Sequence, residues 1–255
     1  MSMTSSPDER RHFILAALKD RGRLTTADLA AEFDMSEDTA RRDFRELATE
    51  GLIQRVHGAA LPLSPAEHPF KTRSQKSRPV KDRLAIRAAS LIKPGQVVIF
   101  DGGTSNLAIA RQVSHALAFT AITNSPETAL ALVDHPAAEV ILLGGVFEKH
   151  SRMTVGTAVL ESFGNIHADL LFFGVHGIDA SAGLTTSGHD EALLKRAMIS
   201  AASESVAVVT ADKIGTAATY RIGPVTQLNT LIVEREADGP AYEALSASGL
   251  AIELA

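Results

Sequence analysis

The stretch MSEDTARRDF, residues 35–44, together with RVHGAA, residues 55–60, decides the first part of the fold. Ser36 can act as an N-cap, because its hydroxyl can accept a hydrogen bond from a free backbone amide of the next turn. The acidic residues that follow Ser36 suit the positive end of a helix. At 3.6 residues per turn, one side of this helix is apolar and carries Ala40, Phe44 and Leu47. We therefore predict an amphipathic helix that begins after Ser36 and buries its apolar side.

The residues around this helix predict the rest of a small domain. Two further helices are expected before it, one over residues 7–21 and a shorter one from Thr25-Thr26. Asp34-Met35 leaves only a tight turn before Ser36, which is typical of a helix-turn-helix. Gly51 suits the residue that ends the last helix, and residues 52–56 alternate in polarity like the first strand of a hairpin. Residues 1–60 are therefore predicted to form a winged helix-turn-helix domain.

The polar side of the predicted helix is rich in arginine, although the domain as a whole is not basic. Residues 1–60 contain one Lys and eight Arg against six Asp and five Glu. Because DNA binding depends mainly on neutralising phosphates, the positive charge must act locally. We predict that Arg42 and Arg45 contact a DNA groove and that other residues at the start of the helix lie near phosphates. The predicted DNA-contacting residues are Thr26, Ser36, Thr39, Arg41, Arg42, Arg45, Arg55 and His57.

Two other interpretations of the arginine-rich side remain open. It can be only a solvated surface, or the small helical domain can bind a protein instead of DNA. The spacing, the cap, the arginines and the wing together favour DNA, whereas each feature alone is weak. Within the helix, Asp43 and Glu46 are expected to orient the arginines.

The composition fits an intracellular chain of two domains. Its 255 residues exceed the usual size of one domain, and 45% hydrophobic residues suffice for a packed core. The lack of cysteine excludes disulfides, zinc fingers and thiol catalysis, and no paired histidine spacing indicates a metal site. The first residues lack an apolar signal region, and no apolar run is long enough to span a membrane. The net charge of −5 argues against general adhesion to nucleic acid or membranes. We expect a cytoplasmic protein without a cofactor.

Residues 61–81 are predicted to be a linker without an obvious rigid element. Pro62, Pro65 and Pro69 disfavour regular structure there. A run of Lys and Arg follows between residues 71 and 87. This run can be a solvated hinge, or it can follow the DNA backbone or contact the neighbouring domain.

From residue 82 to residue 255, helical segments alternate with short apolar segments. A helix is expected over residues 82–92, and apolar strands are expected over 96–101, 119–123, 139–144, 169–174, 205–210 and 230–234. Such alternation with nearly continuous apolar strands is typical of an α/β domain with a mostly parallel, doubly wound sheet. In this architecture ligands bind beyond the carboxyl ends of the strands. We therefore predict that residues 82–255 form an effector-sensing domain.

Glycine-rich and polar residues follow several of the predicted strands. Residues 101–105, DGGTS, open a helix, and the free backbone amides at a helix start form an anion site. Lys213 comes just after a buried strand and is placed to bind a phosphate. The predicted effector-binding residues are Asp101, Gly102, Gly103, Thr104, Ser105, Thr123, Asn124, Ser125, Gly144, Gly145, His176, Thr185, Thr186, Glu191, Lys195 and Lys213.

Each of these fragments also has a simpler explanation. Tight turns between strands and helices use Gly, Ser and Asn for purely steric reasons. Glu191 and Lys195 lie four residues apart and can be an ordinary surface pair contributing ~0.2–0.5 kcal/mol. His176 can be a packed core imidazole. The coincidence of the fragments at one edge of the sheet favours a pocket.

The chain resembles the DeoR family of transcriptional regulators over nearly its whole length. The family's N-terminal signature resembles residues 39–43, TARRD, and residues 51–55, GLIQR. Its sensor-domain motifs resemble residues 101–105, 123–125 and 183–186 and Lys213. His176 departs from the family pattern, in which Asp is common at that position. The resemblance implies a sensor domain with a ribose-5-phosphate isomerase and CoA-transferase-like fold that binds a phosphorylated sugar or a related metabolite.

The resemblance to an isomerase fold raises an alternative, a sugar-phosphate isomerase fused to a DNA-binding module. Isomerisation needs a carboxylate base against the substrate, and the candidates are Asp101, Asp179 and Glu191. A protein-interaction adaptor with a degenerate helix-turn-helix is a third possibility. The fused DNA-binding domain favours binding without turnover. We therefore expect a repressor, not an enzyme, that binds a double-stranded DNA operator and a phosphorylated effector as a homodimer or homotetramer.

Overall fold

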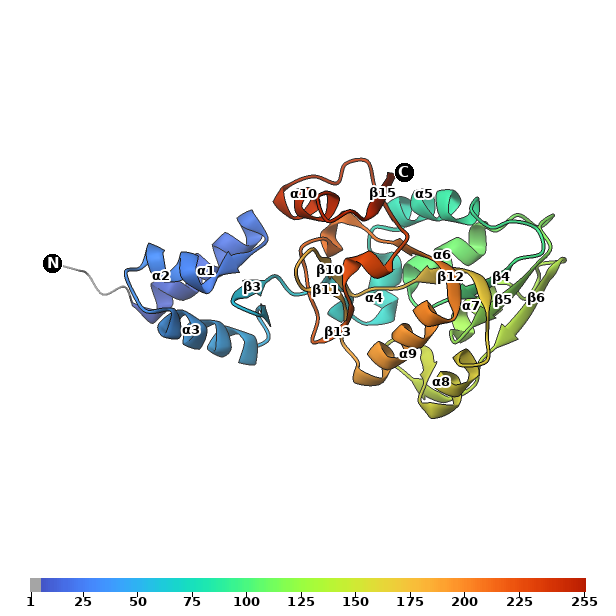
Figure 1. The fold of residues 1–255 in the computed structure, drawn as a ribbon, viewed down its shortest axis with the longest axis horizontal. Coiled ribbons are helices and arrows are strands. Elements are labelled where there is room, and N and C mark those ends of the chain that lie inside the picture. The colour runs from blue at the N-terminus through green and yellow to red at the C-terminus, as the bar shows by residue number, and fades with distance from the viewer. Residues whose placement is uncertain (1–5) are drawn as a thin grey trace.

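The computed structural model describes residues 6–255, and Figure 1 shows a small helical N-terminal domain beside a larger α/β domain. The small domain contains α1 (Pro7–Arg21), α2 (Thr26–Glu32), α3 (Glu37–Thr49) and the hairpin of β2 (Gln54–Val56) and β3 (Ala59–Leu61). A short strand, β1 (Leu24–Thr25), pairs with β3. These elements form the predicted winged helix-turn-helix, whose first five residues lie outside the described part of the chain.

Local sequence signals fix the ends of these helices. Ser36 caps α3, because its hydroxyl accepts a hydrogen bond from the Thr39 amide at 3.2 Å. Asp34 and Gly51 have φ angles of 48° and 70°, so both adopt the left-handed conformation that the two turns require. The apolar sides of the helices pack together in one buried core. The predicted buried side of α3 is confirmed by Ala40, Phe44 and Leu47.

Within residues 6–255, seven parallel strands form the central sheet of the large domain. In spatial order they are β6 (Ala138–Leu142), β5 (Phe119–Thr123), β4 (Val97–Phe100), β9 (Ala168–Phe173), β12 (Ala202–Val208), β14 (Thr230–Val233) and β15 (Ala251–Leu254). The chain builds the sheet outward from β4 through β6, and then from β9 in the opposite direction. The order therefore reverses between β4 and β9, and ligands bind at such a switch point.

Helices lie against both faces of this sheet, and a separate buried cluster forms on each face. One buried cluster packs against α5 (Arg78–Ala89), α6 (Thr104–Gln112) and α7 (Pro126–Ala131). The other packs against α8 (Thr157–Phe163), α9 (His189–Ser200) and α10 (Pro240–Ser246). The predicted α/β class with a doubly wound sheet is confirmed. Among the helices of residues 6–255, none combines the length and the apolar character that a membrane-spanning segment needs.

The prediction that residues 61–81 lack a rigid element is wrong. This segment contains a 3₁₀ turn (Pro65–Glu67), α4 (Phe70–Gln75) and the start of α5. Helix α5 begins before the expected Asp82. Pro65, Pro69 and Pro79 lie at or beside the first positions of these helices, where a missing amide costs little and the fixed φ is already helical. The prolines therefore start helices here instead of interrupting structure.

Two smaller β structures beside the main sheet have no counterpart in the sequence prediction. One is a three-stranded sheet of β10 (Gly177–Asp179), β11 (Gly183–Thr186) and β13 (Tyr220–Gly223). The other is a hairpin of β7 (Val146–Glu148) and β8 (Met153–Val155). Each of these strands has only three or four residues, which is too short for an alternating pattern to stand out.

Candidate functional site

Helix α3 exposes its arginines and buries its apolar side. Arg41, Arg42 and Arg45 are all exposed, and the side chain of Arg42 is 76% accessible. Arg41 pairs with two carboxylates of the preceding turn at 2.6 and 2.9 Å, and Arg42 lies 3.1 Å from Glu46. Exposed pairs of this kind contribute only ~0.2–1 kcal/mol. A DNA phosphate can therefore replace these carboxylates at little cost.

The sequence led us to expect that Asp43 orients the arginines of α3, but it pairs with Arg10 of α1 instead. Its two carboxylate oxygens accept hydrogen bonds from Arg10 Nε at 2.6 Å and from Arg10 Nη2 at 3.0 Å. The pair therefore fastens α1 to α3. Glu46 does contact Arg42, as expected. Spacing along α3 could not reveal the partner of Asp43, because that partner lies 33 residues away on another helix.

The other predicted DNA-contacting residues lie in two environments. Four lie at the start of α3 and on the wing with side chains that are exposed or half-buried: Ser36, Thr39, Arg55 and His57. Thr26 differs from them, because its side chain is buried and its hydroxyl donates to Glu37 Oε2 at 2.7 Å. Thr26 therefore joins α2 to α3. A DNA contact of these residues stays a prediction.

A pocket lies at the switch point of the large sheet, beyond the ends of β4 and β9. Eight of the predicted effector residues line it: Gly102, Gly103, Thr104, Ser105, His176, Glu191, Lys195 and Lys213. Gly174 also lines the pocket, and a Cβ atom there would lie 2.7 Å from the Gly102 carbonyl oxygen and 2.9 Å from Asp101 Oδ2. Glycine therefore lets the ends of β4 and β9 approach each other.

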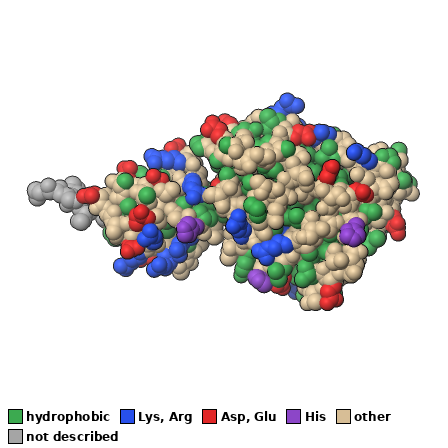
Figure 2. Space-filling model, in the orientation of Figure 1, with side chains coloured by type: hydrophobic (Ala, Val, Ile, Leu, Met, Phe, Trp, Pro, Cys, Tyr) green, Lys and Arg blue, Asp and Glu red, His purple; other side chains and the backbone are tan. Residues whose placement is uncertain are grey.

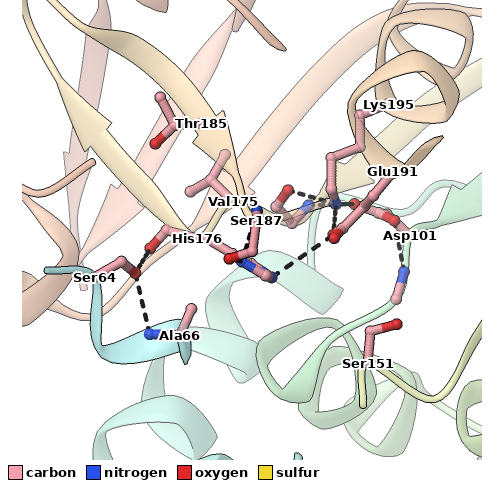
Figure 3. Close-up of polar contacts among 12 residues, drawn as sticks. Ser64, Ala66, Asp101, Ser151, Val175, His176, Thr185, Ser187, Glu191 and Lys195 are labelled. Carbon is pink, nitrogen blue, oxygen red and sulfur yellow. Dashed lines mark hydrogen bonds and ion pairs between the residues drawn. The ribbon is translucent and has the colours of Figure 1, made fainter. Parts of the chain in front are cut away.

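Three charged side chains form a buried network beside this pocket (Figure 3). Lys195 Nζ contacts Asp101 Oδ2, lies 3.3 Å from Glu191 Oε1 and donates to the Gly174 carbonyl oxygen at 2.8 Å. Burial lowers the pKa of Lys195, but the two carboxylates outweigh burial and raise it. Burial raises the pKa of Asp101. For Glu191, burial is outweighed by Lys195 and His176, which lower its pKa. The interpretation of Glu191 and Lys195 as an ordinary surface pair is therefore wrong.

His176 is buried, and its hydrogen bonds define the position of its proton. The Ser187 amide donates to Nδ1 at 3.2 Å, so Nδ1 is an acceptor and the hydrogen of the neutral ring lies on Nε2. Nε2 points toward Glu191 Oε1, 3.7 Å away (Figure 3). Burial lowers the pKa of His176 to about 4 despite the opposing effect of Glu191. The imidazole is therefore neutral near pH 7 and provides one N–H donor.

Three cations gather near the start of α6. Lys213 and Arg73 both line the pocket, and Lys81 lies beside them in the first turns of α5. Burial and repulsion from Arg73 and Lys81 lower the pKa of Lys213 to about 7. Burial and repulsion from Arg73 also lower the pKa of Lys81 to about 8. Because an anion would relieve this repulsion, the arrangement favours a ligand that carries a phosphate.

Eight predicted effector residues are absent from the described lining of this pocket: Asp101, which belongs to the buried network described above, and seven others. Thr123 donates to the Phe100 carbonyl oxygen at 2.7 Å, and Asn124 donates to the Thr154 carbonyl oxygen at 3.0 Å. Ser125 caps α7. These bonds tie the end of β5 and the start of α7 to nearby backbone groups. The remaining four are Gly144, Gly145, Thr185 and Thr186. A role of the seven residues in effector binding stays a prediction.

The pocket also contains residues that sequence reasoning missed. They include Arg73, Asn106, Ser151, Met153 and Val208. Arg73 belongs to the basic run of the predicted linker, and that run was the only signal for it. Ser64, also in the predicted linker, donates a hydrogen bond to the His176 carbonyl oxygen (Figure 3). Among residues 6–255, no group of three His, Asp or Glu side chains could hold a metal ion.

Comparison with protein families agrees with the geometry of both regions. Residues 10–65 match the DeoR-like helix-turn-helix domain, and residues 76–235 match the DeoR C-terminal sensor domain. The chain belongs to the DeoR family. The predicted family and the predicted class, a DNA-binding regulator of transcription, are confirmed.

Individual relatives carry the same kind of name. The HTH-type transcriptional regulator GlpR of Haloferax volcanii is 30% identical to this chain, and the alignment covers 96% of this chain and 97% of the length of GlpR. The glycerol-3-phosphate regulon repressor of Escherichia coli is 28% identical over 96% of this chain and 98% of its own. Ribose-5-phosphate isomerase A of Methanocaldococcus jannaschii aligns over 54% of this chain and 55% of its own, with 17% identity and a TM-score of 0.40. The family and these two sequence relatives are named as regulators, so the alternative of a fused isomerase is not supported.

Proposed function

We propose that this protein is a repressor that binds a double-stranded DNA operator and responds to a phosphorylated sugar or a related metabolite. The meeting of Lys213, Arg73 and the start of α6 at the switch point of the sheet carries the effector half of the proposal. The exposed arginines of α3 support the DNA half. In this proposal Arg42 and Arg45 contact base edges, and the residues at the start of α3 lie near phosphates.

The chemistry of the pocket favours a ligand with an anion at one end and hydroxyl groups at the other. The first amides of α6 follow Gly103 and have no partner within the helix, so they suit a phosphate together with Lys213 and Arg73. His176 supplies a donor and Glu191 supplies a carboxylate acceptor in the same pocket. Sugar hydroxyls both donate and accept, so they can satisfy both groups. A free sugar lacks the anion and should bind poorly.

The names of the relatives fit this class of ligand, since one is the repressor of the glycerol-3-phosphate regulon. The proposal includes a cytoplasmic homodimer or homotetramer. Two recognition helices of such an oligomer would read half-sites about one helical turn apart, roughly 34–36 Å.

Two measurements test this function. A thermal-shift screen of phosphosugars identifies the effector, because a ligand at about 100 times its dissociation constant adds ~2.7 kcal/mol of stability. Operator titrations with and without that effector then measure the coupling, which we expect at ~1–3 kcal/mol, or roughly 5–150-fold. Saturating operator should shift the effector's dissociation constant by the same factor. An effector that binds tightly but leaves operator affinity unchanged would contradict the proposal and leave two independent binding modules.

A further inference from the structure

A second cavity, of about 420 Å³, lies at the junction of the two domains. One wall is formed by Arg23 and by wing residues 54–57. The opposite wall is formed by the loop between β10 and β11, by Thr185 of β11, by the loop before β13 and by Arg221 of β13. This cavity shares no lining residue with the effector pocket among the described residues. It is therefore a separate feature of the molecule.

Direct contacts hold the two walls of this cavity together. Arg23 Nη1 donates to Ser181 Oγ at 2.6 Å and lies 3.7 Å from Asp179 Oδ1. Leu63, just after the wing, bridges to Ala217 in the manner of a parallel strand pair. The wing and β13 therefore face the same space at a defined separation.

The lining of the cavity is basic. Among the described residues it contains three arginines and one histidine and no acidic side chain. Asp179 pairs with Arg23, but within residues 6–255 neither Arg55 nor Arg221 forms an ion pair. Ser181 and Thr219 add hydroxyl groups. Two guanidinium groups without a carboxylate partner, facing one cavity, suit an anion.

The basic lining continues the surface predicted to bind DNA. Arg55 and His57 lie on the wing, and the wing follows α3 directly in the chain. Figure 2 shows Lys, Arg and His side chains on the lower side of the small domain and on the adjoining part of the large domain, all on one face. A DNA duplex carries a negative charge about every 1.7 Å along its axis. A duplex held by α3 and the wing therefore presents phosphates to the surface beside the wing, which favours DNA over a small anion as the occupant.

We propose that operator DNA also contacts the sensor domain at this junction, where Arg221 of β13 binds a backbone phosphate beside the wing. This inference rests on the proposed DNA-binding function and adds the second domain to the interface. Arg221 lies opposite Thr185 across β11 and β13, and the Thr185 carbonyl oxygen accepts a hydrogen bond from the His176 amide at 2.9 Å. The strand pair and this hydrogen bond therefore link Arg221 to His176 of the effector pocket through two backbone contacts.

The salt dependence of DNA binding tests the proposal. Each neutralised phosphate contributes about −0.9 to the slope of log affinity against log salt. Arg221→Ala should reduce the magnitude of this slope by about one unit and weaken operator and unrelated duplexes alike, because a phosphate contact carries no sequence information. Arg221→Lys keeps the charge and should keep the slope. Arg111→Ala removes an exposed arginine at the far end of α6 and serves as the matched control.

The possible outcomes separate this inference from the proposed function. A parent protein that binds no DNA would reject the function itself. A parent that binds, with an Arg221→Ala variant whose affinity and slope equal those of Arg111→Ala, would overturn only the junction contact. Inorganic phosphate is a further probe: if it stabilises the parent but not Arg221→Ala against heat, while the DNA slope is the same for both, the cavity is a small-anion site and the inference is wrong.

Discussion

The arginines of α3 and the charges of the effector pocket form two polar regions that are built in opposite ways. The side chain of Arg42 is 76% exposed, and its partner Glu46 lies four residues away on the same helix. The side chain of Lys195 is 2% exposed, and its partner Asp101 lies 94 residues away. Exposed pairs are weak and easily exchanged, whereas a broken buried pair leaves an uncompensated charge. The first region therefore suits exchange with DNA phosphates, and the second holds the geometry of a pocket.

Replacing Lys195 should have the largest effect on the protein. Lys195→Met leaves Asp101 and Glu191 buried without their cation, so the free energy of unfolding should fall by ~3–5 kcal/mol. Urea denaturation measures this change. The matched variant Arg42→Met removes an exposed cation and should cost less than ~1 kcal/mol. Equal losses for the two variants would remove the contrast between the two regions.

Replacing one of the cations that lie near the start of α6 should weaken effector binding and leave DNA binding intact. Lys213→Ala and Arg73→Ala each remove a charged donor, and each should reduce affinity for the phosphorylated effector by ~1.5–3 kcal/mol. Calorimetric titration measures the affinity for the effector. Operator titration with and without the effector should show that the variants still bind DNA but that the effector no longer changes this binding. Lys93→Ala, which removes an exposed lysine elsewhere, is the control. A parent that binds the free sugar as tightly as its phosphate would rule out an anion site.

The DNA-binding region was predictable because its signals act over a few residues. Ser36 caps the turn that follows it, and Asp34 and Gly51 each bend the chain at their own position. The helical period then places the arginines opposite the buried side. In the large domain, the alternation of helices and apolar strands predicts the doubly wound sheet, and the sheet brings the segments after β4 and β9 together.

The pocket was only partly predictable because tertiary contacts complete it. Arg73 reaches the pocket from α4, and the prolines around it indicated a linker although they start helices. Thr123 ends β5 and Asn124 follows it at the correct edge of the sheet, but their side chains bond to backbone carbonyl oxygens of residues that do not line the pocket. Asp43 pairs with α1 and not with its own helix. The residue types and their spacing carry no signal for such partners.

Replacing an arginine of α3 should weaken operator binding without changing stability. Arg42→Ala or Arg45→Ala should cost ~1–3 kcal/mol of operator affinity if the side chain makes a bidentate base contact, and should relax preference at one base pair. The free energy of unfolding should stay within about 0.5 kcal/mol of the parent, because both side chains point away from the core. Binding measured on a set of operator variants at one salt concentration checks this. A variant with parental affinity would show that α3 faces DNA differently.

The pH dependence of effector binding should be the smallest of these effects. It tests most directly the contrast between the charges of the effector pocket and the exposed arginines of α3. The pKa of Lys213 in the free protein is about 7, because of burial and repulsion from Arg73 and Lys81. A bound phosphate raises that pKa, so above pH 7 binding takes up a proton. Affinity is then fully present below pH 7 and falls as pH rises further, by at most about tenfold or ~1.4 kcal/mol per pH unit. Calorimetric titrations between about pH 6.5 and 8.5 measure this change in affinity. This range lies above the second phosphate pKa of roughly 6, so the phosphate itself stays doubly charged.

The control variant Lys213→Arg stays protonated throughout this range. It should leave only the later decline from Lys81, whose pKa is about 8. An unchanged pH profile in Lys213→Arg would assign the titration to another group, and the half-buried Lys213 would then keep its charge like the exposed arginines of α3.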